Sequence, residues 1–304
     1  MGGYVIIYIA EKSILGLRQR GGMTVICREQ DGVLIMTKQH EHGLLAGEFA
    51  KWFKEEHTPA EGRRAEVLWA VSNHDRGWID LDETPFWNDA EGLPYSFLDF
   101  PVVPKLTFYR RGIDEIEAQT PYGALLCSSH FERLIEVSGE ECPELTQYLQ
   151  DEADRRARIH RGLEQSKPLE EGELYYDARL LQFCDDLSLF LALSKPGSIE
   201  SEKHPWFVDG FSGSEEFSFT SGRAIEAEWQ DSTTLTLTPF PFTKEIEVSF
   251  KQRRVSRKAI EDKGIAEAYR NAPEEECRIT VISGAEEDSQ VKTGASQPSE
   301  RQQR

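Results

Sequence analysis

The residues with the clearest potential for chemistry are a histidine and an aspartate that adjoin at the end of an apolar helical run. They are His74 and Asp75, in the segment Asn73-His74-Asp75-Arg76-Gly77-Trp78. A polar or charged side chain inside an apolar helix costs free energy unless it is paired or bound to a metal ion. We therefore interpret the pair as half of a metal site. Gly77 would permit the turn out of the helix, and Trp78 would pack there.

Residues of the same kind recur on three further segments with helical spacing, as His42, His130 and Asp186. Each has an ordinary structural explanation when taken alone, because His42 could cap a helix or face solvent and Asp186 could pair with an arginine. Helix bundles, however, build metal sites from facing inward side chains, and four such places on four helices favour a shared site. Mixed imidazole and carboxylate ligands suit Mn, Fe, Zn, Ni or Co without singling out one metal.

The composition excludes some classes of partner. The chain has 304 residues and a formal net charge of −19, with 35 Lys and Arg against 54 Asp and Glu. Nucleic acids and anionic membrane surfaces require a positive field, so neither is expected as a partner. A small phosphorylated molecule is compatible with this charge, because a metal ion supplies local positive charge. Five scattered cysteines without a C-x-x-C pair indicate free thiols and a cytoplasmic location.

Hydrophobic periodicity divides the chain into a helical part and a strand-rich part. A hairpin of two short strands, at 24–28 and 33–36, is expected about Asp31-Gly32. Spacing typical of helices follows at 39–54, 65–75, 122–137, 144–165 and 174–194. The long aromatic segment 76–121 shows little helical periodicity, and we expect it to wrap over these helices.

Beyond residue 200 the apolar residues alternate with a period of two, which predicts half-buried antiparallel strands. The alternating segments are 217–220, 224–229, 234–238 and 246–250. A helix at 256–272 and a strand at 278–282 complete the pattern. The expected fold class is therefore α+β, with a helical bundle, an N-terminal β-hairpin and a mostly antiparallel C-terminal sheet that the hairpin could join.

The order of the candidate ligands resembles a known superfamily. The order is His42, then His74-Asp75, then Asp186, all on expected helices. This order resembles that of the His-Asp (HD) metal-dependent phosphohydrolases, in which such residues ligate a metal ion. A closer resemblance is to an uncharacterised bacterial family that pairs Q-x-x-H-x-x-L-x-G with H-D-x-G-W, S-x-H and D-x-L-S-L. It covers about residues 23–283, whereas the HD resemblance covers the helical portion and implies an HD-like bundle there.

The resemblance implies a choice between neighbouring candidates. His42 rather than His40 would be the first ligand, because Gln39 stands three residues before it. Asp186 is preferred over Asp185 as the last ligand, because it directly precedes a Leu-Ser pair. The implied cofactor is a divalent metal ion.

The resemblance also implies roles around the ion. Asp75 would orient or bridge, and His130 would be an extra ligand for a second ion or a proton donor to the leaving group. Phosphohydrolases of this type carry a Lys or Arg near the metal for the phosphate. Arg76 and Arg133 are the candidates in this chain.

The function implied is a divalent-metal-dependent phosphohydrolase that acts on a small phosphomonoester or phosphodiester. The alternative, from another class, is a non-catalytic ligand-binding or regulatory protein with a degenerate HD-like fold. We interpret residues 1–22 as a non-native or disordered extension, because Met23 begins a segment typical of a protein start. The hairpin and the metal-binding bundle would fill 23–196, a β-rich region packed on it 197–284, and a disordered tail 285–304.

Overall fold

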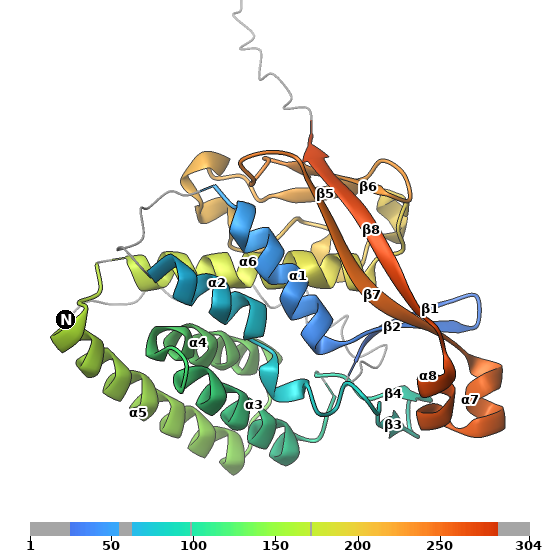
Figure 1. Ribbon diagram of the computed structural model, residues 1–304, viewed down its shortest axis with the longest axis horizontal. Helices are drawn as coiled ribbons and strands as arrows, with labels where there is room; N and C mark the ends of the chain where they lie inside the picture. The colour runs from blue at the N-terminus through green and yellow to red at the C-terminus, as the bar shows by residue number, and fades with distance from the viewer. Residues whose placement is uncertain (1–24, 55–62, 98, 171, 285–304) are drawn as a thin grey trace, which may run out of the picture.

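The computed structural model describes residues 25–54, 63–97, 99–170 and 172–284. The expectations for residues 1–22 and 285–304 lie outside this part of the chain. Within it the architecture is α+β, with eight α-helices, a six-stranded sheet and a small two-stranded hairpin (Figure 1). None of these helices combines the length and the apolar character that a membrane crossing requires.

The N-terminal hairpin and the C-terminal strands form one sheet. Its strands are β1 (Ile26–Gln30), β2 (Val33–Thr37), β5 (Glu226–Trp229), β6 (Thr234–Thr238), β7 (Ile246–Ser256) and β8 (Glu274–Ser283). Their order is β1-β2-β7-β8-β6-β5, and all neighbours run antiparallel except β6 and β8. The hairpin joins the sheet through β2, where Leu34 lies opposite Val255. Asp31 and Gly32 turn between β1 and β2 with φ of 52° and 74°, as a tight hairpin requires.

Six longer helices form the rest of the core. They are α1 (Gln39–Trp52), α2 (Arg63–Asn73), α3 (Val102–Glu117), α4 (Pro121–Ser138), α5 (Pro143–Ser166) and α6 (Glu173–Leu193). Helices α1 and α6 contact each other, and both contact the sheet, α1 at β7 and α6 at β1 (Figure 1). Residues on several faces of α6 are buried, and its second half, from Leu187 to Leu193, is apolar except for Ser188.

The segment 76–121 contains more regular structure than its sequence indicated. It includes α3 and the small hairpin β3 (Trp87–Asn88) and β4 (Leu93–Pro94). Pro101 and Pro104 suggested an irregular segment, but they lie at the N-cap and in the first turn of α3, where a missing N–H leaves no helical hydrogen bond unmade.

The strand expected at 217–220 is wrong. The structure has two short 3-10 helices there, Ser214–Glu216 and Ser218–Thr220. The aromatic rings of Phe217 and Phe219 both pack on Phe53, with centroid distances of 4.8 and 5.7 Å, so alternate residues share one side instead of facing opposite sides. The helix expected at 256–272 is divided at Gly264, which has φ of 77°, into α7 (Arg257–Lys263) and α8 (Ile265–Asn271).

Three glycines let the helices that carry the candidate ligands approach closely. A Cβ atom on Gly47 of α1 would lie 1.9 Å from Ser72 Oγ of α2. A Cβ atom on Gly77 would lie 2.2 Å from the carbonyl oxygen of Phe108 in α3, and one on Gly112 would lie 2.7 Å from the amide nitrogen of Gly77. Gly77 is therefore required for close packing against α3, and not for a turn with positive φ as its position suggested. Trp78 packs at this crossing and is buried, as expected.

Candidate metal centre

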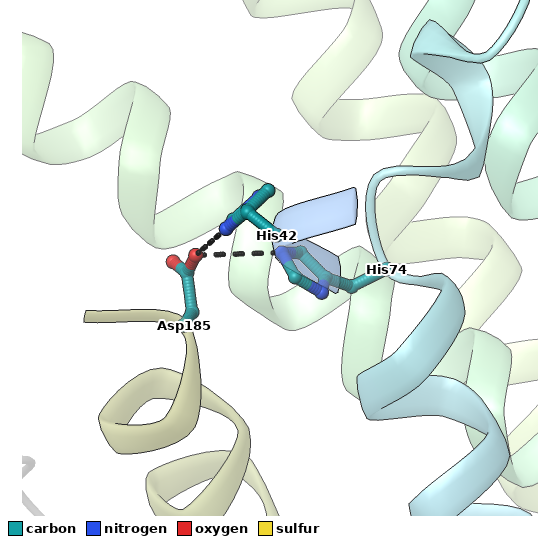
Figure 2. Close-up of side chains that lie close together, drawn as sticks. All are labelled: His42, His74 and Asp185. Atoms are coloured by element: carbon teal, nitrogen blue, oxygen red, sulfur yellow. Dashed lines mark ion pairs between the residues drawn. The ribbon is translucent and has the colours of Figure 1, made fainter. Parts of the chain in front are cut away.

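Three helical segments bring His42, His74 and Asp185 together (Figure 2). His42 belongs to α1, Asp185 to α6, and His74 directly follows the last residue of α2. One ligand atom from each of the three lies within 4.8 Å of the others. All three side chains are buried, so the group could hold a metal ion.

His74 directs its Nε2 atom toward two carboxylates. Its Nδ1 atom lies 2.8 Å from the carbonyl oxygen of Val71, and a carbonyl can only accept, so Nδ1 carries the proton. Nε2 lies 3.4 Å from Asp185 Oδ1 and 3.6 Å from Asp75 Oδ2, and it has no hydrogen-bond partner among the described residues. Burial alone would lower the pKa of His74, but the two carboxylates raise it to about 9. Without a metal ion, Nε2 of His74 therefore carries a proton as well, and a bound metal ion would take the place of that proton.

His42 links the other residues of the centre. Its Nε2 atom lies 2.6 Å from Asp75 Oδ2, and its Nδ1 atom lies 2.8 Å from Ser188 Oγ and 3.7 Å from Asp185 Oδ1. The Asp75 side chain is 14% exposed, against 1% for His42. Asp75 therefore faces the side of the centre that is most open to solvent.

The contacts Ser188–His42–Asp75 have the order of a serine hydrolase triad. Ser188 is fully buried, and its hydroxyl donates a hydrogen bond of 2.8 Å to the carbonyl oxygen of Asp185. A nucleophile must reach the substrate, and this hydroxyl cannot. The arrangement therefore supports a role for Ser188 within the centre and not as a nucleophile.

The preference for Asp186 over Asp185 needs correction. Consecutive helical residues point about 100° apart, so only one of them can face the histidines, and the structure brings Asp185 there. The Asp186 carboxyl hydrogen-bonds with Gln182 and lies near Arg133, and burial, with the charge of Asp185, raises its pKa to about 7. Burial would also raise the pKa of Asp185, but the neighbouring His74 holds it below its usual range.

The sequence contained a signal for this choice. Counted back from Leu187-Ser188-Leu189, the motif D-x-L-S-L begins at Asp185, with Asp186 at the variable position. Ser188 stands three residues after Asp185, which places both on one face of the helix. Sequence reasoning missed Asp185 and Ser188 because it weighed adjacency to the Leu-Ser pair and not helical spacing.

His130 packs against His74, with 5.5 Å between the two ring centroids, and also faces Asp185. Its Nε2 atom is 3.5 Å from Asp185 Oδ2, whereas His42 and His74 face Oδ1. Burial lowers the pKa of His130 to about 4, although the charge of Asp185 acts in the opposite direction. His130 thus lies beside the ring of His74 and faces the second carboxylate oxygen of Asp185.

The two arginine candidates have different surroundings. Arg76 forms an ion pair with Glu115, in which its Nε atom lies 2.6 Å from Glu115 Oε2. Arg133 is half-buried on α4, three residues after His130, and the charged groups near it include Asp186 and Glu216, although it forms no ion pair within 4.0 Å in the described part of the chain. Burial lowers the pKa of Arg133, and the charge of Asp186 partly offsets this.

Comparisons with known proteins place these residues in a family. A search of the curated proteins gives no match, and neither does a search of the solved structures. A family model with the description "Protein of unknown function (DUF3891)" matches residues 25–257. The matched segment runs from the N-terminal hairpin to the start of α7 and includes every residue of the candidate centre. The chain therefore belongs to the DUF3891 family.

Proposed function

We propose that this protein is a divalent-metal-dependent phosphohydrolase that acts on a small phosphomonoester or phosphodiester. The observation that carries the proposal is the buried Nε2 atom of His74, which lacks a hydrogen-bond partner among the described residues and faces the carboxylates of Asp75 and Asp185. A buried polar atom without a partner calls for a group that would complete the site. A metal cation that replaces the proton on Nε2 would complete the site, with the two carboxylates balancing its charge.

The donor atoms have the types and spacing of a metal site. Ligand bonds of ~2.0–2.2 Å at angles near 90–110° place neighbouring donors about 3.0–3.5 Å apart. Asp185 Oδ1 and Asp75 Oδ2 lie 3.4 and 3.6 Å from His74 Nε2, while the 2.6 Å contact of His42 Nε2 with Asp75 would lengthen. Mn, Fe, Zn, Ni and Co all accept such a mixed nitrogen and oxygen set.

The bound ion would lower the pKa of a coordinated water from ~15.7 toward ~7, as in other metal hydrolases. Asp75 is the member of the set with the greatest exposure, so it would orient water and substrate at the open side. The order His42, His74-Asp75, Asp185 along the chain supports the resemblance to HD phosphohydrolases, with Asp185 in the place given to Asp186 from the sequence.

An arginine of α4 would bind the negatively charged phosphoryl group of the substrate. Arg133 has no ion-pair partner in the described chain and stands one helical turn from His130, so its guanidinium is available for a phosphoryl oxygen. Arg76 is less suitable, because Glu115 already occupies its Nε. His130, beside the second oxygen of Asp185, would hold a second ion, because burial lowers its pKa to about 4 and keeps its ring neutral near pH 7.

One observation favours a second function, a ligand-binding or regulatory protein without catalysis. His42 and His74 are each 1% exposed and Asp185 is 4% exposed. Structural metal sites are closed, whereas catalytic sites keep an open position for water. In this alternative the ion would hold α1, α2 and α6 together.

The test measures metal content and hydrolysis in the same preparations. The purified protein should carry near-stoichiometric transition metal and hydrolyse p-nitrophenyl phosphate or bis-p-nitrophenyl phosphate. His74→Ala and Asp75→Ala should abolish both, whereas His160→Ala, a histidine on α5 whose side chain is 50% exposed, should change neither. A metal-loaded protein that is inert toward phosphoesters would favour the binding function, and a metal-free protein would contradict both.

A further inference from the structure

The hydroxyl of Ser188 bridges the backbone of α6 and the ring of His42. Ser188 Oγ lies 2.8 Å from the carbonyl oxygen of Asp185 and 2.8 Å from His42 Nδ1. A hydroxyl has one proton, and a carbonyl oxygen can only accept. Ser188 donates its only proton to the carbonyl oxygen of Asp185, so it can only accept a hydrogen bond from His42. This hydrogen bond requires a proton on Nδ1 of the His42 ring.

This hydrogen bond decides which nitrogen of His42 can bind an ion. Of the two nitrogens, Nδ1 is the one near Asp185, at 3.7 Å, and Nε2 is the one near Asp75, at 2.6 Å. We infer that Ser188 is a positioning residue that blocks Nδ1 and presents Nε2 of His42 to the metal. The ion would then lie on the Asp75 side of the His42 ring.

The two imidazoles would be held in the same way. His74 Nδ1 is hydrogen-bonded to the carbonyl oxygen of Val71, and His42 Nδ1 to Ser188, so both rings present Nε2. Each Nε2 lies close to the same atom, Asp75 Oδ2, at 2.6 Å from His42 and 3.6 Å from His74. The electron pairs of Nε2 and of a carboxylate oxygen repel each other at 2.6 Å unless a proton or a cation lies between them.

An ordinary explanation predicts something different. Serine in a helix often donates to a carbonyl one turn back and has no further role. In that case removal of the hydroxyl would leave metal binding unchanged, and the ring of His42 could carry its proton on either nitrogen. Hydrogen-bond partners of metal-bound histidines, in contrast, usually contribute ~10–100-fold to metal affinity.

The experiment uses Zn²⁺ alone and the full-length protein. Zn²⁺ affinity is measured by competition with a chelating dye for the wild type, Ser188→Ala, Ser188→Thr and Ser194→Ala. Ser194 is the control, because it is a buried serine at the C-cap of α6 whose hydroxyl has no partner among the described residues. Ser188→Ala should weaken Zn²⁺ binding about 10–100-fold, Ser188→Thr should recover much of it, and Ser194→Ala should bind as the wild type does.

A second readout does not depend on the variants. ¹⁵N–¹H correlation spectra of the imidazoles in the Zn²⁺-loaded wild type should show the His42 proton on Nδ1 and the metal on Nε2. A metal-bound Nδ1, or wild-type affinity in a folded Ser188→Ala protein, would overturn the inference. If Ser188→Ala does not fold, the spectra of the wild type decide.

This inference rests on the metal centre of the proposed function but not on hydrolysis. A wild type that binds no Zn²⁺ would overturn both. If Zn²⁺ affinity depends on Ser188 as expected but the wild type hydrolyses no phosphoester, only the hydrolase function would be overturned. Zn²⁺ binding with full hydrolysis in Ser188→Ala would overturn only the role of Ser188.

Discussion

His42 Nε2 lies 2.6 Å from Asp75 Oδ2, although the two residues are 33 positions apart and come from different helical segments. The contact exists because α1 and α2 cross closely at Gly47, where a Cβ atom would lie 1.9 Å from Ser72 Oγ. Close packing at two glycines, Gly47 and Gly77, therefore places His74 and Asp75 against His42 of α1.

The choice between the two adjacent aspartates of α6 gives a matched pair of variants. Asp185→Asn should reduce metal affinity by more than the roughly 10–100-fold that the loss of an outer hydrogen-bond partner costs, because Asp185 Oδ1 lies 3.4 Å from Nε2 of His74, the nitrogen that would bind the ion. Asp186→Asn should bind metal as the wild type does. Titration with Zn²⁺ measures both, and a stronger loss in Asp186→Asn would restore the sequence-based preference.

Gly77→Ala should destabilise the fold. The added methyl group would lie 2.2 Å from the carbonyl oxygen of Phe108, so the backbone of α3 must shift, at a cost of about 1–3 kcal/mol. Gly162→Ala is the control, because a Cβ atom at this position would have nothing within 4 Å. Gly162 lies inside α5, where alanine should stabilise the folded protein by about 0.5–1 kcal/mol. Urea unfolding compares the two, and equal stabilities would contradict the close packing at Gly77.

Asp82 gives a prediction about pH. It accepts hydrogen bonds from the backbone N–H groups of Gln39 and His40 at the start of α1, yet burial raises its pKa from 3.8 to about 7. The Asp82 carboxyl group thus binds its proton more tightly in the folded state than in the unfolded state. From about pH 4 to pH 7 the wild type should therefore lose stability relative to Asp82→Asn, by up to about 1.4 kcal/mol per pH unit.

The measurement is urea unfolding of both proteins at several pH values, with the difference between them taken at each pH. The difference isolates Asp82 from the other carboxylates, whose contributions appear in both proteins. A difference that does not change with pH would show that Asp82 is ionised throughout this range in the folded protein.

Arg133 should contribute to substrate binding and Arg76 should not. Removal of a charge-assisted hydrogen bond costs about 1.5–3 kcal/mol, so Arg133→Gln should lower kcat/KM by about tenfold or more toward a phosphomonoester. Arg76→Gln should change it less than about twofold, because Arg76 is 36% exposed and paired with Glu115, and such surface pairs contribute little. Steady-state kinetics with both variants tests this, and the reverse ranking would assign the phosphate to Arg76.

Much of the fold could be predicted from the sequence, because its elements carry strong periodic patterns. The apolar run of α6 and the alternation of β6 predicted both elements. The pattern at 217–220 failed because Phe217 and Phe219 both pack on Phe53, a contact between segments that no local pattern encodes. Helix α3 was missed because two prolines near its start resembled the breaks of an irregular segment.

The candidate centre was predicted in its residue types and only partly in its members. His42 and His74 are brought together as expected, since each belongs to a short local motif, one within α1 and one at the end of α2. The choice between Asp185 and Asp186 depends on which face of α6 meets the histidines, and the Ser188 contact depends on a residue 146 positions away from His42. Such relations are set by helix packing, which adjacency in the sequence does not report.

The most direct test is the anomalous difference map of a crystal of the wild-type protein soaked with Zn²⁺ and measured above the zinc absorption edge. We expect one strong peak within ~2.0–2.2 Å of Nε2 of His42, Nε2 of His74 and a carboxylate oxygen of Asp75 or Asp185. A map with no peak among these residues, or with its strongest peak elsewhere in the protein, would contradict the metal centre.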